Sequence, residues 1–418
     1  MLGWMVCIFL LLVIGGYFIF IRLKDNKSRR VINKKASVEI EEEEVLILSE
    51  REWPQLVTGD QHTIFVDTNN RVWGCGKNVS GELGLPESFY PIPTQINVAT
   101  EIHSVAVGNL HTILLDFNGR VFTSGAPPQN GRQDSGIFTK NFHLLPNIPL
   151  IQSIAAGNHH SLLLSCKGYV YSFGKNEHGQ LGLGNSQHRY TPARVSVAEK
   201  IVSLAAGYFH TLLLDDKGQV WATGFNSGGQ LGLGDLISRH FPQQIAFDQP
   251  VKSVHARGKH SAIVVDEENI YTFGDNKYGQ LGIELFNRYP KKLTVPRKVQ
   301  SLPSISTVCL APRHSFFIDF SGYLWICGGT SSNLGLDYDT QTIPLPKCVG
   351  DDLPLMRKIS VGGFYTMFVD YDDNLWACGQ NKKGQLGLGD TQPRGKPELV
   401  SATPQLVVPI SVKSARKV

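Results

Sequence analysis

The chain has 418 residues, of which 42% are hydrophobic and 18% charged, with 42 glycines and 22 prolines. It is long enough to bury a large core, and so much glycine at ordinary hydrophobicity indicates many tight turns rather than disorder. The formal net charge of +4 hides two opposite N-terminal blocks, residues 1–35 and 36–52, and the near-neutral remainder lacks the basic footprint of a nucleic-acid-binding protein. We therefore expect no nucleic-acid partner.

The first predicted element is a transmembrane helix over residues 2–21, a run of twenty residues without a charge. At about 1.5 Å per residue such a helix spans roughly 30 Å, the thickness of one bilayer core. Seven Lys and Arg side chains follow within residues 22–35 and none precedes the run. This asymmetry predicts a single-pass protein whose remainder faces the cytosol, without indicating which membrane. A cleaved signal peptide would need a basic start, a shorter apolar run and a small-residue cleavage site, and the sequence has none of them.

A charged linker is predicted over residues 22–51. It contains the acidic run EIEEEE at 39–44. Charged runs of this kind stay solvated and extended, which is typical of a tether. An acidic docking motif is the alternative interpretation of 39–44.

Residues 52–402 contain seven copies of a unit of about fifty residues. Six copies have His followed by Thr or Ser, and the seventh has Tyr365-Thr366. Successive copies are 49, 49, 50, 50, 54 and 51 residues apart, and a fixed period of this size is typical of repeat architectures. The repeat histidines are His62, His111, His160, His210, His260 and His314.

Each unit is predicted to be a small antiparallel sheet. In the copy at 200–235, short apolar strands precede the glycine-rich run GFNSGGQLGLGD, and Gly218 lies in the turn between the second and third strands. Every copy has Gly or Asn at that position, as turns with positive φ require. One such sheet cannot bury both of its faces, whereas seven stacked around an axis can. The predicted fold is therefore all-β, a seven-bladed β-propeller.

The domain boundaries follow from this architecture. The propeller is predicted over residues 52–412, followed by a basic tail at 413–418. Either 405–412 or 45–48 would add an edge strand that closes the ring, and the protein is expected to be a monomer. A phosphate-binding loop is needed once, whereas the glycine-rich runs recur from unit to unit, which favours structural corners over phosphate chemistry.

The sequence contains no motif of covalent catalysis. HExxH, GxSxG and CxxC are all missing, so we expect no metal site, no cofactor and no catalytic residue. Cys75, Cys327 and Cys378 occupy the same place in three different repeats. Equivalent positions point the same way rather than toward each other, so we expect free thiols. A hydrolase site assembled in the central funnel from distant residues is the remaining enzymatic alternative.

The repeated pattern resembles the regulator of chromosome condensation repeat family, whose fold is a seven-bladed propeller. The resemblance rests on the G-x-x-H-[TS] start, the Asp/Gly turn and the N-x-x-G-Q-L-G-x-G corner, all in register in this sequence. WD40 and kelch propellers are the alternative architectures; the period exceeds that of WD40, and no Trp-Asp pair ends the strands. Three units depart from the family pattern: the second has GAPPQNGRQDSG at 125–136, the sixth lacks the corner Gln, and the seventh has Tyr365.

The resemblance also implies a function. The family's founding member is a guanine-nucleotide exchange factor for the small GTPase Ran, which acts by binding the nucleotide-free GTPase most tightly. Its contacts lie in the G-x-x-H loops on one face of the propeller. Because residues between Gly and His vary among the units, we predict that they bind the partner, while the histidines hydrogen-bond the backbone and tie the inner strands together. The predicted partner-binding residues are Asp60, Asn109, Asn158, His159, Tyr208, Phe209, Lys259, Arg313 and Phe364.

A non-catalytic scaffold that recruits a cytosolic protein to a membrane is the alternative function. Relatives of the family serve as binding platforms, and one is a plant ultraviolet-B photoreceptor with tryptophans in these loops, which this chain lacks. The family's exchange factor also uses a protruding wedge. The nearest candidates for a wedge here are the altered segments 125–145 and 284–304.

Overall fold

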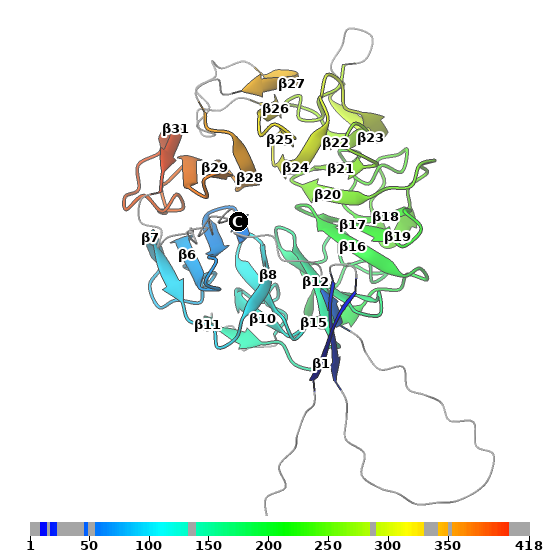
Figure 1. The fold of residues 1–418 in the computed structure, drawn as a ribbon. Coiled ribbons are helices and arrows are strands. Elements are labelled where there is room, and N and C mark those ends of the chain that lie inside the picture. Colours follow the sequence, from blue (N-terminus) through cyan, green and yellow to red (C-terminus); the bar gives the residue numbers. More distant parts are fainter. Residues whose placement is uncertain are drawn as a thin grey trace, which may run out of the picture.

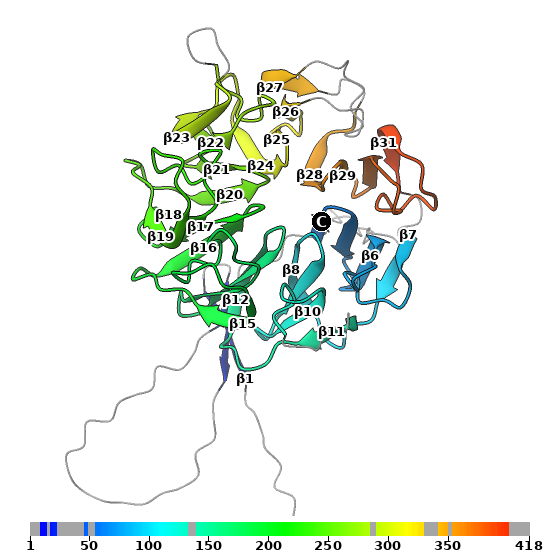
Figure 2. The same cartoon turned by 180° about the vertical axis from the view of Figure 1, so that it is seen from behind.

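The structure, a computed structural model, describes residues 9–14, 17–22, 46–48, 55–132, 139–284, 290–329, 342–349 and 353–400. Its main body consists of seven four-stranded antiparallel sheets, each built from strands that are consecutive in the sequence. Figures 1 and 2 show these sheets as blades in a ring, with β8, β16, β20, β24 and β28 nearest the centre. The predicted all-β, seven-bladed propeller is confirmed.

The blades follow one another in chain order from β4 to β31. Blades 1 to 4 are β4–β7 (Gln55–Thr58, His62–Val66, Val72–Lys77, Phe89–Ile96), β8–β11 (Ile102–Val107, His111–Asp116, Val121–Gly125, Thr139–Leu144), β12–β15 (Ile151–Ala156, His160–Ser165, Val170–Gly174, Arg189–Arg194) and β16–β19 (Ile201–Ala206, His210–Asp215, Val220–Gly224, Arg239–Gln244). Blades 5 to 7 are β20–β23 (Ser253–Arg257, His260–Val264, Ile270–Asp275, Lys292–Lys298), β24–β27 (Ile305–Ala311, His314–Asp319, Leu324–Gly328, Ile343–Val349) and β28–β31 (Met356–Val361, Tyr365–Asp370, Leu375–Gly379, Arg394–Leu399).

A buried aspartate organises the turn between the second and third strands. In blade 4, Asp215 Oδ1 accepts hydrogen bonds from the backbone N–H groups of Lys217 (3.0 Å) and Gln219 (2.8 Å). Its other oxygen accepts one from Trp221 Nε1 at 3.0 Å. A side-chain oxygen that binds the backbone two residues on is what makes aspartate a turn former. The same tryptophan contact recurs in the pairs Asp67–Trp73, Asp319–Trp325 and Asp370–Trp376.

The glycine-rich runs are corners that lead from the third strand to the fourth. In blade 4 the Asn226 side chain accepts a hydrogen bond from Leu231 N at 3.0 Å, and Gln230 accepts one from Gly228 N at 2.9 Å. Gly232 has φ +69°, and a Cβ there would lie 2.8 Å from the Phe273 ring of the next blade. Glycine is therefore needed both for the backbone conformation and for close approach between blades.

The second blade keeps more of the corner than its sequence indicates. The carbonyl of Gln129 accepts a hydrogen bond from Ser161 at 2.9 Å, as the carbonyl of Gln180 does from its own neighbouring blade. Gly131 has φ +70° and packs against the Phe173 ring. The segment therefore replaces the corner in sequence while reproducing its contacts.

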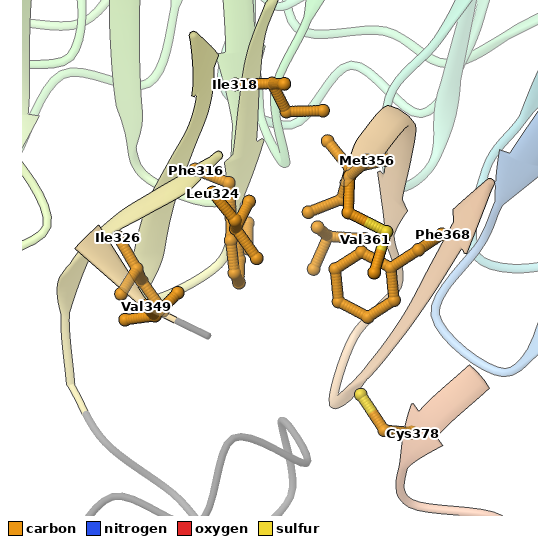
Figure 3. Packing of buried hydrophobic residues seen from close by; sticks show 11 residues of the cluster. Phe316, Ile318, Leu324, Ile326, Val349, Met356, Val361, Phe368 and Cys378 are labelled. Atoms are coloured by element: carbon orange, nitrogen blue, oxygen red, sulfur yellow. The ribbon is translucent and has the colours of Figure 1, made fainter. Parts of the chain in front are cut away.

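The hydrophobic core lies between the blades. Each of the seven junctions between neighbouring blades has its own cluster of buried apolar side chains. Figure 3 shows one of them, in which Phe316 and Leu324 of blade 6 face Met356 and Phe368 of blade 7. Burying both faces of every sheet in this way makes each blade depend on its two neighbours.

The ring closes by packing of blade 7 against blade 1. The Thr58 and Ser360 hydroxyls are 2.9 Å apart, and Tyr365 Oη donates to the His62 carbonyl at 2.6 Å. Among the described strands, no blade takes one from the other end of the chain. The prediction that 45–48 adds an edge strand to the ring is wrong, because β3 (Leu46–Leu48) pairs with β2 instead. The alternative, 405–412, and the tail at 413–418 lie outside the described residues.

The uncharged N-terminal run differs from the helix predicted over 2–21. The structure has two antiparallel strands there, β1 (Phe9–Ile14) and β2 (Tyr17–Arg22), which form a three-stranded sheet with β3. These strands contain three Phe, three Ile and one Tyr, residues that favour strands. The Gly-Gly pair between them in the sequence is typical of hairpins. In the part of the chain that the structure describes, no helix is long and apolar enough to cross a bilayer.

Candidate protein-interaction site

The loops that join the first and second strands of the blades lie on one face of the ring, which we call the loop face. In blade 4 the loop is closed by a hydrogen bond from Gly207 N to the His210 carbonyl at 2.9 Å. The imidazole folds back over the glycine, where an added Cβ would lie 2.0 Å from the ring. The G-x-x-H spacing is thus a packing requirement, and it leaves the two middle residues free to vary.

The repeat histidines form a chain of contacts around the ring. All six are buried. The sequence predicts that they bind the backbone, but five of them reach a side-chain hydroxyl of the next blade, because Nε2 points away from its own loop. These contacts, of 2.9–3.1 Å, are His62–Thr112, His111–Ser161, His160–Thr211, His210–Ser261 and His260–Ser315.

The direction of these hydrogen bonds can be assigned. The Thr211 hydroxyl donates its only proton to the Gln180 carbonyl at 2.8 Å, so it accepts from His160 Nε2 at 3.0 Å. Nδ1 of His160 is then an unprotonated acceptor, and it is buried without a partner. Burial lowers the pKa of His160, like that of His210, to about 3. These imidazoles are therefore neutral scaffold groups.

The last two junctions depart from the pattern. Tyr365 replaces the seventh histidine, and its hydroxyl lies 3.0 Å from the Thr63 hydroxyl of blade 1, so the link between blades is retained. At the junction of blades 6 and 7 the corresponding atoms are His314 Nε2 and Thr366 Oγ1. Both are buried without a hydrogen-bond partner in the described structure. This junction lacks the link that the others have.

The predicted partner-binding residues are on the accessible side of the same loops. Lys259, Arg313 and Phe364 are exposed, the last with 39% of its surface accessible. The others are half-buried, and they are Asp60, Asn109, Asn158, His159, Tyr208 and Phe209. The structure thus separates the residues between Gly and His from the buried histidines that follow them.

Aromatic side chains of blades 3 and 4 form a row on this face. The Phe209 ring lies 5.3 Å from His178, 6.3 Å from His159 and 6.4 Å from Phe225, measured between centroids. The Lys259 ammonium lies 5.9 Å from the centre of the Phe225 ring. The sequence did not indicate His178 or Phe225, because both come from the corners and not from the G-x-x-H loops. The third strand ends at the loop face, and Phe225 N donates to the Phe209 carbonyl at 2.8 Å.

A second group on the loop face joins blades 5, 6 and 7. The Arg313 guanidinium lies 4.8 Å from the Tyr278 ring centre and 5.6 Å from that of Phe364. Both distances are within the range of cation–π attraction. Tyr278 is another corner residue that the loop pattern missed, whereas Arg313 and Phe364 were predicted.

An ion pair crosses the centre of the ring at the same face. Arg257 Nη2 of blade 5 lies 3.4 Å from Asp60 Oδ1 of blade 1. Asp60 was predicted as a contact residue, but Arg257 was not. Arg257 occupies the position of the loop glycine in its unit, so the signal was the missing glycine. Burial raises the pKa of Asp60, and the Arg257 and Lys77 charges oppose that shift.

This arrangement is suited to binding a protein. Among the described residues, no three His, Cys, Asp or Glu side chains are placed to hold a metal ion. Desolvation raises the pKa of the Cys309 thiol to about 11 and that of Cys75 to about 12, so both are poor nucleophiles near neutral pH. Rigid aromatic and cationic side chains on a fixed scaffold are typical of protein-binding surfaces.

Comparison with known proteins identifies the family. The profile of the RCC1-like domain matches residues 24–284, and the regulator of chromosome condensation (RCC1) repeat matches residues 267–318 and 372–416. A second profile of the same repeat matches residues 356–385. The chain therefore belongs to the RCC1-like family.

One curated relative matches a short part of the sequence, and several solved structures share the fold at 20–21% identity. RCC1 repeat-containing protein C10F6.04 of Schizosaccharomyces pombe is 41% identical over 71 residues, which is 16% of this chain and 20% of that protein. Human WBSCR16 is 21% identical with a TM-score of 0.70, over 79% of this chain and 94% of that one. Prp20p of Saccharomyces cerevisiae, described with its binding to Gsp1p and histones, is 21% identical with a TM-score of 0.69, over 75% and 81% of the two chains. A structure of Kap60 bound to yeast RCC1 (Prp20) gives 20% identity and a TM-score of 0.72, over 89% and 91%.

Proposed function

We propose that the loop face binds a protein partner and that this partner is a Ran-like small GTPase, whose nucleotide exchange the propeller regulates. The main support is that the buried histidines and the accessible residues between Gly and His lie on opposite sides of the same loops. The repeat histidines are buried, and five of the six link neighbouring blades, while Phe209, Arg313 and Phe364 are among the aromatic and cationic side chains on the accessible side of the loops. Membership of the RCC1-like family and the binding of Gsp1p by the related Prp20p support the choice of partner.

The proposed mechanism needs no covalent step. An exchange factor accelerates nucleotide release by binding the nucleotide-free GTPase more tightly than the loaded one. Such a difference in affinity requires a binding surface that is complementary to the nucleotide-free GTPase and does not rearrange to fit the nucleotide-bound GTPase equally well. Phe209 and Tyr208, whose ring centroids are 6.3 Å apart on a loop fixed by buried His210, provide such a rigid surface.

The test is release of fluorescent GDP from Ran and from a panel of other small GTPases, with the full chain as the added protein. We expect acceleration with one GTPase, and loss of that acceleration in the Tyr208→Ala/Phe209→Ala double variant. Phe241→Ala is the matched control, because Phe241 is 55% exposed on the fourth strand of the same blade. Unchanged release with every GTPase would contradict the exchange activity. Capture of a GTPase without faster release would favour the scaffold function.

We also propose that the N-terminal segment attaches the propeller to a membrane with the propeller on the cytosolic side. The support is compositional: residues 2–21 are uncharged and seven basic residues follow within 22–35. In lipid, every backbone polar group must be paired within the segment, which favours a helix there. Fractionation of cells tests this proposal. Recovery of the full chain in the soluble fraction, at the level of a chain lacking residues 2–21, would contradict it.

A further inference from the structure

Among the described residues that line the central channel of the propeller, one side chain is charged. A cavity of about 240 Å³ lies on the axis, lined by the innermost strands of all seven blades. Most of the lining is small or apolar, with four alanines, and Arg257 is the one charged residue among its lining side chains. The lining residues are Val57, Thr58, Val105, Ala106, Val107, Ala156, Ala206, Ala256, Arg257, Cys309, Leu310, Ser360 and Val361.

The Arg257 guanidinium is only partly satisfied. Its side chain is 14% exposed, and Nε is buried without a hydrogen-bond partner in the described structure. Its Nη2 lies 3.4 Å from Asp60 Oδ1, which is long for a charge-assisted hydrogen bond. By contrast, the Arg71 and Arg120 guanidinium groups each meet their aspartate at 2.7 Å. A guanidinium has five N–H donors, and leaving them unpaired in a buried site is costly.

The electrostatic balance at this end of the channel is positive. Asp60 is the acidic group that faces Arg257; burial raises the pKa of its carboxyl, and the charges of Arg257 and Lys77 oppose that shift. The charge of Lys77 acts on Asp60, and the charge of Arg313 acts on the Tyr208 hydroxyl together with those of Asp60 and Arg257. Lys77 has a carboxylate of its own, since its ammonium lies 3.5 Å from Glu82. Among the described residues Arg257 pairs with Asp60 at 3.4 Å, and its buried Nε lacks an acceptor.

We propose that the mouth of the channel on the loop face is a carboxylate site. There Arg257 binds an acidic side chain of the protein partner, which replaces Asp60 as the partner of the guanidinium. A carboxylate matches the planar fork of arginine and can take the unpaired Nε and an Nη donor together. The Tyr208 hydroxyl, on the neighbouring blade, is a further donor at the mouth. This proposal deepens the proposed function, since it rests on the loop face being the contact surface, and it names the chemistry of the partner's anchor.

The test uses small probes, so that it does not depend on any GTPase. The unfolding temperature of the full chain is followed against concentration of a blocked Gly-Glu-Gly tripeptide at constant ionic strength. The matching Gly-Gln-Gly peptide is the control, and acetate distinguishes a free carboxylate from a peptide-borne one. A ligand that binds the folded state raises the unfolding temperature with its concentration. We expect a response to the Glu peptide, a weaker one to acetate and none to the Gln peptide.

Two substitutions should change the affinity in opposite directions. Asp60→Asn removes the carboxylate that competes for Arg257 and should raise the affinity for the Glu peptide about threefold. Arg257→Gln should lower that affinity about tenfold. If Arg257→Gln does not fold, Arg257→Lys keeps the charge without the fork and should lie between wild type and loss of binding. A purely structural ion pair would give two less stable variants and no opposite change in affinity. Equal responses of the wild type and Arg257→Gln would overturn the proposal.

The outcome is separable from that of the proposed function. Binding of the Glu peptide without any effect on a GTPase would keep the carboxylate site and reject that partner. Accelerated nucleotide release by the Arg257→Gln variant at the wild-type rate would keep the exchange activity and reject this anchor.

Discussion

The hydrogen bond between a repeat histidine and a hydroxyl of the next blade can be tested by comparing two junctions. The junction of blades 3 and 4 has this bond, whereas that of blades 6 and 7 has the hydroxyl but not the bond. Thr211 and Thr366 occupy the same position in blades 4 and 7, directly after the repeat histidine or its tyrosine replacement, and both are buried. Thr211 accepts from His160 at 3.0 Å and donates to Gln180 at 2.8 Å, whereas Thr366 Oγ1 has no partner in the described structure. Replacing each threonine by valine keeps the shape and removes only the hydroxyl.

The expected effects differ in size and in sign. Thr211→Val leaves a buried N–H of His160 and the Gln180 carbonyl without this partner, and each unsatisfied group costs about 1–3 kcal/mol. The free energy of unfolding should therefore fall by about 2–6 kcal/mol. Thr366→Val removes a buried hydroxyl that has no partner, so its stability should be unchanged or raised by up to about 1 kcal/mol.

The assay is urea unfolding of the full chain at pH 7.5, followed by tryptophan fluorescence. Both variants should keep the wild-type dependence of stability on urea, so the midpoint alone reports the difference. Equal destabilisation by the two substitutions would refute the hydrogen-bond assignment. So would a loss of less than about 0.5 kcal/mol in Thr211→Val, because that is below the net value of one typical hydrogen bond.

Acidification should destabilise the fold, since burial lowers the pKa of the repeat histidines in the folded state far below 6.5, most of them to about 3. The contribution of these neutral histidines to the free energy of unfolding is present above pH 6.5 and is lost as the pH falls toward 3. The loss is about 1.2 kcal/mol per histidine between pH 7 and 5.5. Urea midpoints that stay constant over this range would contradict the prediction. Asp215→Asn should cost about 1–3 kcal/mol in the same assay because three hydrogen bonds reach its carboxylate. The adjacent, exposed Asp216→Asn should cost less than about 0.5 kcal/mol, and equal losses would show that the turn does not depend on the charge. Gly232→Ala should lower the thermal midpoint more than Gly234→Ala, because its Cβ would meet Phe273 at 2.8 Å while Gly234 has open space; the reverse order would rule out the corner packing.

The repeat could be predicted from the sequence because each of its parts has a local cause. The His-to-His spacing fixed the seven units, and the turn glycines fixed the hairpins. The second strands of the six His-containing blades begin at their repeat histidines, and that of blade 7 begins at Tyr365. What remained hidden was the partner of each histidine, since a contact to the next blade spans about fifty residues and depends on how the blades stack.

The candidate site was predicted in part for the same reason. Residues between Gly and His could be named from their own loops. His178, Phe225 and Tyr278 could not, because they belong to corners that reach the loop face only through the third strand. The N-terminal run shows the opposite limit: hydrophobicity and length favour a helix over residues 2–21, yet the same composition also suits the strands β1 and β2.

Departures from the repeat are more informative than the repeat itself. A side chain at the loop glycine of blade 4 would collide with the histidine ring, as the 2.0 Å approach at Gly207 shows. Blade 5 carries Arg257 at this position and accommodates it by pairing Arg257 directly with His260, so that Gly258, with φ +56°, makes the turn. Blade 6 has the same arrangement, with Ala311 at the glycine position paired directly with His314, so the rearranged loop does not itself require a cation. What is particular to blade 5 is that this position carries a guanidinium that crosses the axis to Asp60. The proposed carboxylate site gives that charge a function, which the change of loop conformation alone does not.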